Sequence, residues 1–421
     1  MLDLPRLLAG AATLAVLLLA PLSAAAVVLE VPTHHATIQD AIDAASSGDL
    51  IYVRSGRYEE RLVLRNKTVS IVGDGMGHTI VHSGDADPLV SIEGGQVDLV
   101  SLSLVGSPWD ADVGSWTETS KQGIVSKDAD LTLANVEVMR IHNYFVSAEG
   151  GTLDIANVRL HQGGYAIQAD IGLMLEHCEA DIWWLQVPDP RIDHVVMVNG
   201  AAEPLPPSEL RKVVRLTDSE IALSRLSWGD GVVVFSDAIV EVIDNTFVRD
   251  VVAGASTVRG IAVSGVRSEV TVRGNFIHRA PIGIQAQRYA TNRVRIEHNR
   301  IYDSINAGVR LHYGDADAVD LGGGPLGSRG GNQFCRWGAS SAVDLRFDSF
   351  GTQSLSALGN SWSHPSPPAV IHDHYDDSSL PPAIWWDFFQ QPLDPCLTIQ
   401  WPDPIQPLPE PLLPEIVQPL P

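Results

Sequence analysis

Two short apolar patterns alternate along most of the chain, and this repetition limits the fold more than any other sequence feature. The first pattern starts with a small or aromatic residue and continues with alternating apolar positions. Its copies are GIVS (123–126), YFVS (144–147), YAIQ (165–168), HVVMV (194–198), GVVVF (231–235), GIAVS (260–264), GIQA (283–286), GVRL (308–311) and SAVDL (341–345). They recur roughly every 20 to 40 residues, which is the period of solenoid repeats.

The second pattern lies between copies of the first and reads apolar-x-apolar-x-x-Asn-x-apolar. Its copies are LTLANVEV (131–138), LDIANVRL (153–160), LMLEHCEA (173–180), VRLTDSEI (214–221), VEVIDNTF (240–247), VTVRGNFI (270–277) and VRIEHNRI (294–301). Each copy is too short to bury its own apolar face, whereas stacked copies enclose one continuous core. The sequence therefore predicts an all-β solenoid of parallel coils.

A polar residue recurs at one register of the second pattern. These residues are Asn135, Asn157, His177, Asp218, Asn245, Asn275 and Asn299. Such side chains tolerate the bent backbone of a turn and can hydrogen-bond to the same residue of the next coil. We therefore expect a structural ladder along one turn of the solenoid, and not a set of catalytic groups.

The N-terminal part of the solenoid is expected to carry a short helix over residues 37–45. Ile38, Ala41, Ile42 and Ala45 have helical spacing, and Thr37 suits the N-cap position. A solenoid leaves the core of its terminal coil open, so an amphipathic helix at this point predicts a cap.

Residues 1–26 have the pattern of a secretory signal, with Arg6, an apolar run over 7–19 and a small-residue end at 24–26. The apolar run is shorter than a membrane span needs, although an uncleaved anchor helix remains the alternative. We expect a signal at 1–26, the solenoid at 27–391 and a proline-rich, extended tail at 392–421. Export would place the protein outside the cell, in the periplasm or on the cell surface.

Export also implies an oxidising compartment, in which the three cysteines can pair. Cys335 and Cys396 both lie in the C-terminal part, whereas Cys178 lies within a repeat. The favoured interpretation is a Cys335–Cys396 disulfide with Cys178 as a buried free thiol.

The charge of the chain limits its partners. With 28 Lys+Arg and 51 Asp+Glu, the formal net charge is −23. This excludes nucleic acid as a first hypothesis. It also disfavours polyanionic ligands unless calcium or a local row of arginines intervenes.

Residues 36–81, ATIQDAIDAASSGDLIYVRSGRYEERLVLRNKTVSIVGDGMGHTIV, resemble the first coils of pectin-lyase-like right-handed parallel β-helix proteins. The resemblance is strongest to pectin methylesterases, which begin with a similar helix, a G-x-Y-x-E segment and a V-G-D-G turn. It implies a right-handed parallel β-helix with a short N-terminal capping helix. Segments 320–334 and 357–377 look like the closing coil of secreted β-helix families without assigned function.

The resemblance does not extend to the known catalytic motifs. The Q-D-T, D-F-I-F-G and G-R-P-W strings of methylesterases are absent, and so is the N-T-D, D-D and G-H-G set of polygalacturonases. Neither activity is therefore expected, and the matched Gly56-Arg57-Tyr58-x-Glu60 segment is assigned to the fold.

Catalytic candidates come from outward positions of the first pattern. Strand alternation predicts a row of Gln285, Arg310 and Asp344 across neighbouring coils. Arg310 could pair with a sugar carboxylate, or act as the base of a lyase beside a calcium ion held by Asp315, Asp317 and Asp320. No other cofactor is expected.

Binding candidates come from aromatic residues near the loops that enter the first pattern. They are Trp109, Trp116, Tyr144, Trp183 and Trp184. Aromatic faces stack on sugar rings, so these residues and Gln285 are predicted to bind substrate. Nearby acids, Asp193 among them, could supply a carboxylate for glycoside cleavage.

The run Ile371-His372-Asp373-His374 resembles a metal-binding sequence, but the closing-coil resemblance explains it, so no metal site is predicted. We expect an exported β-helix protein that recognises an extracellular polysaccharide. One alternative is a polysaccharide lyase or glycoside hydrolase acting on the same face. The other is a structural or adhesive surface protein without catalysis.

Overall fold

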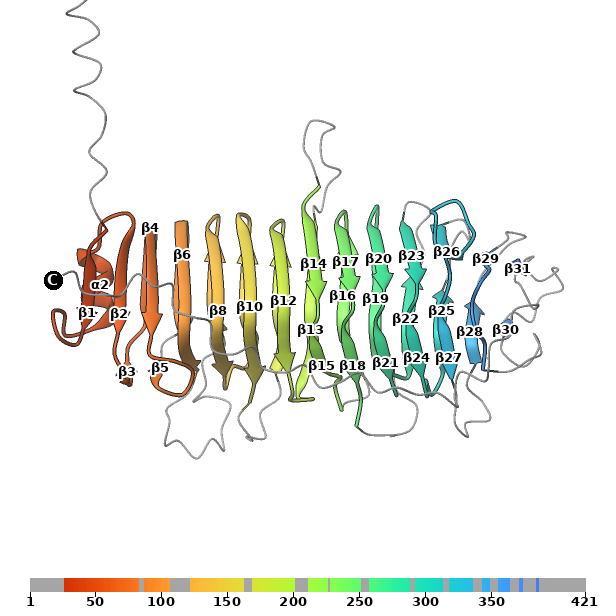
Figure 1. Cartoon of the computed structure of the whole chain (residues 1–421), viewed down its shortest axis with the longest axis horizontal. Coiled ribbons are helices and arrows are strands. Elements are labelled where there is room, and N and C mark those ends of the chain that lie inside the picture. The colour runs from red at the N-terminus through yellow and green to blue at the C-terminus, as the bar shows by residue number, and fades with distance from the viewer. Residues whose placement is uncertain are drawn as a thin grey trace, which may run out of the picture.

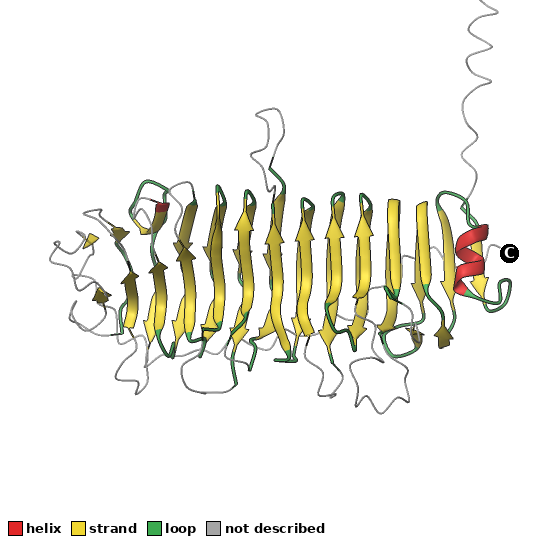
Figure 2. Cartoon of the chain, turned by 180° about the vertical axis from the view of Figure 1, so that it is seen from behind, coloured by secondary structure: helices red, strands yellow, loops and turns green. Residues whose placement is uncertain are grey.

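Strands stack side by side into a rod in the computed structural model, with a helix, α2 (Ile38–Ala44), at the end near β1 (Figure 1). The structure describes residues 26–82, 87–106, 122–162, 169–200, 211–225, 228–250, 257–287, 292–312, 318–335, 343–348, 355–363, 371–373 and 384–385. Seen from behind, these residues form strands and loops apart from the helix and one very short helical turn (Figure 2). None of the described helices is long and apolar enough to cross a membrane.

The strands form three columns, and the pairings run parallel along the rod. Five strands turn a corner and contribute to more than one column: β4 (Leu62–Gly73), β6 (Val90–Val105), β8 (Asp130–Met139), β10 (Thr152–His161) and β12 (Glu179–Val187). The first column also contains β1 (Val28–Val31), β2 (Asp49–Val53), β14 (Val213–Thr217), β17 (Ile239–Ile243), β20 (Glu269–Arg273), β23 (Arg293–Glu297), β26 (Val319–Gly322), β29 (Leu355–Ala357) and β31 (Ile384–Trp385).

The second column adds β3 (Gly56–Glu59), β5 (Thr79–His82), β15 (Glu220–Ala222), β18 (Thr246–Val248), β21 (Phe276–His278), β24 (Arg300–Tyr302) and β27 (Gln333–Cys335). The third column adds β7 (Gln122–Lys127), β9 (Tyr144–Glu149), β11 (Ala169–Glu176), β13 (Ile192–Asn199), β16 (Asp230–Ser236), β19 (Arg259–Val266), β22 (Ile282–Gln287), β25 (Ala307–His312), β28 (Val343–Asp348) and β30 (Ile371–Asp373). One strand from each column makes one coil, which confirms the predicted all-β parallel β-helix.

Apolar side chains from all three columns meet in one core. In a single coil, Val232, Val240 and Phe247 come from the third, first and second columns, and each is at most 1% exposed. The same inward positions repeat from coil to coil, so the core runs along the rod, as expected for a solenoid.

Glycines begin many copies of the first sequence pattern because the third column has no room for a side chain there. A Cβ at Gly231, Gly260 or Gly283 would lie 2.4 to 2.6 Å from a carbonyl oxygen of the next coil. Contacts this short do not occur for real Cβ atoms. The glycines, each the second residue of its strand, thus let neighbouring coils approach closely where the third column begins.

The capping helix forms where the sequence predicts it. The Thr37 side chain accepts a hydrogen bond from the Asp40 N–H at 3.0 Å, and Ile38, Ala41 and Ile42 are buried. Glu60 completes the cap, because its carboxylate accepts the N–H groups of Ile38 and Gln39 at 2.9 Å each. The glutamate of the G-x-Y-x-E segment therefore stabilises the helix N-terminus, in agreement with its assignment to the fold.

The predicted asparagine ladder is present in the second half of the rod. Asn245, Asn275 and Asn299 are buried, and each side-chain amide donates to the Oδ1 of the next asparagine at 2.9 to 3.0 Å. The ladder continues through Asn332 to Asn360, which the repeat pattern did not include. It satisfies backbone groups as well, since each amide also donates to a strand carbonyl.

Four residues predicted for the ladder lie elsewhere. Asn135 and Asn157 stand one position earlier in the turn, at φ 56° and 55°, and hydrogen-bond to each other at 3.0 Å. Asp218 has the same left-handed backbone at φ 48°, and the adjacent Ser219 accompanies Asn245. The turn has the same number of residues in these coils, but the polar residue is the fifth of the eight-residue pattern at Asn135, Asn157 and Asp218 and the sixth at Asn245.

His177 belongs to a different corner. It follows β11 in the third column, and the strand assigned to LMLEHCEA is in fact the end of β11 and the start of β12. The turn of that coil contains Trp184 in place of an asparagine, with φ 58° and 1% exposure. This turn has no polar residue like the asparagines of the other coils, so the repeat pattern assigned His177, from the preceding turn, to the ladder.

The cysteines that the structure describes agree with the expected pairing. Cys335 is disulfide-bonded. Cys178 is free and buried, and burial raises the pKa of its thiol to about 11, so it is an unreactive thiol. Cys396, the segment 1–25 and the tail 392–421 lie outside the described residues, so the predicted signal and tail boundaries remain predictions.

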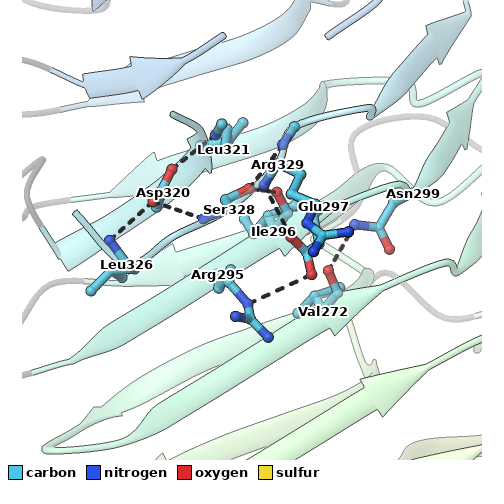
Figure 3. A network of polar contacts seen from close by, with 12 residues as sticks. Val272, Arg295, Ile296, Glu297, Asn299, Asp320, Leu321, Leu326, Ser328 and Arg329 are labelled. Atoms are coloured by element: carbon cyan, nitrogen blue, oxygen red, sulfur yellow. Dashed lines mark hydrogen bonds and ion pairs between the residues drawn. The ribbon is translucent and has the colours of Figure 1, made fainter. Parts of the chain in front are cut away.

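Asp320 organises the glycine-rich segment near the end of the rod (Figure 3). Its carboxylate accepts backbone N–H groups from Gly322, Gly324, Leu326 and Ser328 at 2.9 to 3.1 Å, and it is completely buried. Calcium binding by this carboxylate would require it to give up these bonds. Asp315 and Asp317, the other proposed calcium ligands, lie outside the described residues.

Glu137 in β8 gives a pH-dependent contribution to stability. Its Oε1 lies 2.8 Å from Nε2 of His161, and the Ser103 hydroxyl donates to Oε2 at 3.0 Å. The hydrogen bond from His161 is the main cause that lowers the pKa of Glu137 below its ordinary value of 4.5. Because this pKa is depressed in the folded state, the stabilisation is present above about pH 5 and is lost as the pH falls through the folded value.

We predict that Glu137→Gln lowers the melting temperature at pH 7, and that the difference from wild type shrinks below about pH 4. Thermal unfolding of both proteins at the two pH values measures this. A difference of the same size at both pH values would show that the carboxylate's charge is irrelevant.

Candidate functional site

The third column presents one row of chemically distinct side chains where its strands begin. Tyr144 of β9 is in register with Ile171 of β11, which is in register with His194 of β13. The row continues through Asp230 of β16 to Arg259 of β19. Successive coils are about 4.8 Å apart, so His194, Asp230 and Arg259 are direct neighbours.

Asp230 lies between two basic side chains. One of its carboxylate oxygens is 2.9 Å from Nη2 of Arg259, and Nε of Arg259 donates to the other oxygen. Nδ1 of His194 lies 2.9 Å from Oδ2 of Asp230, although its N–H direction is not aligned for a linear hydrogen bond. The Asp230 side chain is 0% exposed, whereas those of His194 and Arg259 are 18% and 20% exposed. The buried carboxylate thus holds two partly accessible basic groups at the surface.

Trp228 lies directly beside this trio. Its ring centroid is 5.5 Å from that of His194, and the residue is 47% exposed. Gly229 makes this approach possible, because a Cβ there would lie 2.4 Å from the carbonyl oxygen of Asp193, and its φ is +137°. We call Trp228, His194, Asp230 and Arg259 the Trp228 site.

Apolar side chains follow the Trp228 site along the third column. Met174 and Met197 are in register on two successive coils and are partly exposed, whereas Val233, next in the row, is 1% exposed. Phe235, two residues beyond Val233, is 39% exposed. The site thus combines apolar faces with hydrogen-bonding groups, a combination typical of ligand sites.

The predicted catalytic residues do not gather at one point. Asp193 neighbours His194 but is 2% exposed, and its carboxylate accepts the Ser224 hydroxyl at 3.3 Å. Asp344 is 1% exposed and accepts the backbone N–H and the hydroxyl of Ser363 at 2.7 Å each. Both carboxylates are therefore engaged inside the protein.

The expected row of Gln285, Arg310 and Asp344 needs a correction. Gln285 is in register with Arg310, as predicted, but the next residue of the row is Arg346 and not Asp344. Asp344 lies two residues earlier in the strand than Arg346 and occupies the position of the close-packed Gly308 of the preceding coil. Gln285 itself is only 3% exposed.

The aromatic residues predicted to bind substrate do not lie together either. Tyr144 is half-buried and lies in the same row as His194, two coils away. Trp183 is 38% exposed but belongs to β12, where it pairs with residues of the first column, and Trp184 is buried. Trp109 and Trp116 lie outside the described residues. The substrate-binding role of these residues remains a prediction.

Sequence reasoning missed Trp228, Asp230 and Arg259. The predicted strand pattern begins at Gly231 and does not include Trp228 or Asp230, although a tryptophan beside turn residues is an available signal. The pairing of Asp230 with side chains of two other coils depends on coil lengths and register, which the repeat pattern gives only approximately. Among the described residues no group of three or more His, Cys, Asp or Glu side chains could hold a metal ion.

Comparison with known proteins supports the fold. A probable pectinesterase/pectinesterase inhibitor 17 of Arabidopsis thaliana is 51% identical over 47 residues, which are 11% of this chain and 9% of that protein. This match and the three parallel columns confirm the resemblance seen in the sequence. The fold is of the pectin-lyase-like type. Because the match spans so little of the relative's length, it assigns no activity to this chain.

Two further comparisons concern the rest of the pectin-lyase-like rod. Residues 212–370 match a family described as "Protein of unknown function (DUF1565)". Among solved structures, the mannuronan C-5 epimerase AlgE4 A-module of Azotobacter vinelandii is similar with a TM-score of 0.48 and 15% identity, covering 83% of this chain and 93% of that one. Pectin methylesterase PemA from Erwinia chrysanthemi gives 0.36 and 11%, covering 65% and 88%. Similarities this distant carry no information about the Trp228 site.

Proposed function

We propose that this protein recognises an extracellular polysaccharide at the Trp228 site. The observation that carries the proposal is the half-exposed indole of Trp228, held against His194 beside a buried carboxylate and a guanidinium. An exposed indole offers a flat apolar face on which a sugar ring stacks. His194 and Arg259 add hydrogen-bonding groups for the sugar hydroxyls at the edge of that face.

The shape of the rod suits a long ligand. Each coil repeats the same outward positions, so a polymer with a repeating unit meets similar positions on neighbouring coils. The partly exposed Met174 and Met197 extend the apolar contact surface over two neighbouring coils. The predicted secretory signal and the disulfide at Cys335 support an extracytoplasmic location, where such polymers occur.

Trp228→Ala is predicted to weaken glycan binding about fivefold or more, because stacking on an indole contributes on the order of 1 kcal/mol or more. Isothermal calorimetry with a panel of soluble neutral and uronic polysaccharides measures the affinity. The matched control is Trp183→Ala, which removes an indole of similar exposure, 38%, from another column.

The control also decides between two positions for the site. Unchanged affinity in Trp183→Ala with loss in Trp228→Ala supports the Trp228 site. A loss of affinity only in Trp183→Ala would place glycan binding at Trp183, one of the substrate-binding residues predicted from the sequence. A panel to which the wild-type protein does not bind would defeat the proposal and favour a structural surface protein.

A further inference from the structure

Four side chains of the second column face outward and are nevertheless buried. Ile277, Ile301 and Phe334 point into the main core from β21, β24 and β27, so strand alternation turns their neighbours outward. These outward neighbours are Phe276, His278, Tyr302 and Cys335, which are 1%, 6%, 3% and 1% exposed. We call these four residues the second-column patch.

The second-column patch is mainly aromatic. The rings of Phe276 and His278 are stacked with their centroids 6.0 Å apart, and Tyr302 meets Phe276 edge to face at 5.6 Å. The guanidinium group of Arg300 lies over the Phe276 ring, 5.4 Å from its centroid. Exposing aromatic surface of this size to water costs free energy, so the burial of the patch stabilises the fold.

No described helix or strand covers the second-column patch from outside. The described strands all belong to the three columns, and α2 lies near β1 at the other end of the rod (Figure 1). The described turns beside the patch, 279–281 and 303–306, are short connections that lead into β22 and β25. The cover is therefore to be sought in chain outside the described residues.

A disulfide brings one such segment to the patch. The chain has three cysteines, of which Cys178 is free and Cys335 is disulfide-bonded, and this leaves Cys396 as the partner within the chain. Because Cys335 belongs to the patch, the bond holds the Cα of Cys396 within about 7 Å of it. Phe276 lies two strand spacings further along the column, roughly 10 Å. An extended segment over 397–403 spans about 20 Å, which is enough to cross the patch.

The sequence around Cys396 suits an aromatic surface. Residues 392–404 read PLDPCLTIQWPDP, in which Leu397, Ile399 and Trp401 lie between prolines. The prolines prevent this segment from joining the sheet as a regular strand, and they favour an extended polyproline conformation. Proline-rich chain in this conformation docks on surfaces lined by aromatic side chains.

The charges of the two surfaces are complementary. Arg279 and Arg300 flank the patch. Asp303 lies 3.5 Å from Nε2 of His278. Two arginines and one aspartate give one net positive charge when the imidazole is neutral, whereas segment 392–404 contains two aspartates and neither lysine nor arginine. A second copy of the chain is a less suitable occupant, because two molecules of net charge −23 repel each other.

We propose that residues 397–403 dock on the second-column patch and are held there by a Cys335–Cys396 disulfide. The docked segment shields the aromatic side chains from water and closes this part of the second column to other ligands. The outward face of the third column, which carries the Trp228 site, stays open. Docking of the tail does not depend on polysaccharide recognition at that site.

Nitration of Tyr302 by tetranitromethane, followed by peptide mass spectrometry, measures whether the patch is covered. A chain that ends at Cys396 keeps the disulfide but lacks the docking segment. We expect Tyr302 to be nitrated at least about tenfold faster in this variant than in the full-length protein, because modification of a buried group requires local opening. Tyr144 of the third column is the internal control and should react at the same rate in both proteins.

A point variant covers the case in which the truncated chain does not fold. Trp401→Ala should raise the rate of Tyr302 nitration at least about threefold, because it removes the largest apolar side chain of the docking segment. Trp228→Ala is the matched control, since it removes an indole from the third column and should leave Tyr302 protected. Circular dichroism of each variant shows whether the rod is folded.

Three results would overturn the docking of the tail. Continued protection of Tyr302 in a folded chain that ends at Cys396 would assign the cover to another segment, such as 336–342. Protection that disappears when the full-length protein is diluted would assign the cover to a second copy of the chain. Peptide mapping without reduction that finds no Cys335–Cys396 link would remove the tether on which the docking depends.

Discussion

Replacing Asp320 with alanine is expected to lower the free energy of unfolding by about 3 to 5 kcal/mol. The carboxylate accepts four backbone N–H groups from residues 322–328, and a truncated side chain leaves them without an acceptor inside the protein. Hydrogen bonds to an ionised group are among the stronger ones in proteins. The glycine-rich segment that they hold also packs against Leu358 of the following coil. The C-terminal coils should therefore lose their order first.

Urea unfolding and amide hydrogen exchange of Asp320→Ala measure this loss. Glu220→Ala is the control, because it removes the same charge from an exposed strand position and should change stability by less than about 0.5 kcal/mol. We expect faster exchange over 318–335 in Asp320→Ala before the N-terminal coils change. A loss below about 1 kcal/mol would mean that solvent replaces the carboxylate freely.

Asn275→Ala is expected to cost about 3 kcal/mol, because Asn275 lies in the middle of the buried ladder. Its amide donates to Val242 O at 2.8 Å and to Asn299 Oδ1 at 3.0 Å, and its own Oδ1 accepts from both the backbone and the side chain of Asn245. Truncation interrupts all four bonds and leaves a cavity in the turn.

The control for the ladder is Asn157→Gly. The side-chain amide of Asn157 donates to Oδ1 of Asn135 on the partly exposed turn, and glycine accepts its φ of 55° without strain. Equilibrium unfolding should show a loss below about 1 kcal/mol for this variant. Equal losses in the two variants would contradict a special role for the buried ladder.

Much of the fold could be predicted because solenoid repeats leave local signals. Gly231 and Gly260 start their strands because a carbonyl of the next coil blocks a side chain, and Thr37 caps a helix through a bond to a residue three positions later. The repeat pattern failed where it treated neighbouring positions of a turn as one. Asn157 is the fifth residue of its eight-residue copy and Asn245 the sixth, so the two lie at adjacent positions of the turn.

The candidate site was less predictable because its contacts join different coils. Nothing near His194 in the sequence indicates Asp230 or Arg259, and the pairing arises only when three coils are in register. The exposure of Trp228 could not be predicted either, since tryptophans of this chain lie both at the surface, as Trp228 does, and in the interior, as Trp184 does. The predicted row also misplaced Asp344, because Arg310 pairs with Arg346 and a period of two does not fix the register between two coils.

The central claim is that a polysaccharide lies over the Trp228 site, and hydrogen–deuterium exchange with the tightest-binding glycan of the panel tests its position directly. We predict slower exchange at 192–199, 228–236 and 259–266, the strands and the loop that carry His194, Asp230 and Arg259. Protection confined to other parts of the chain, such as 179–187 around Trp183, would contradict the account.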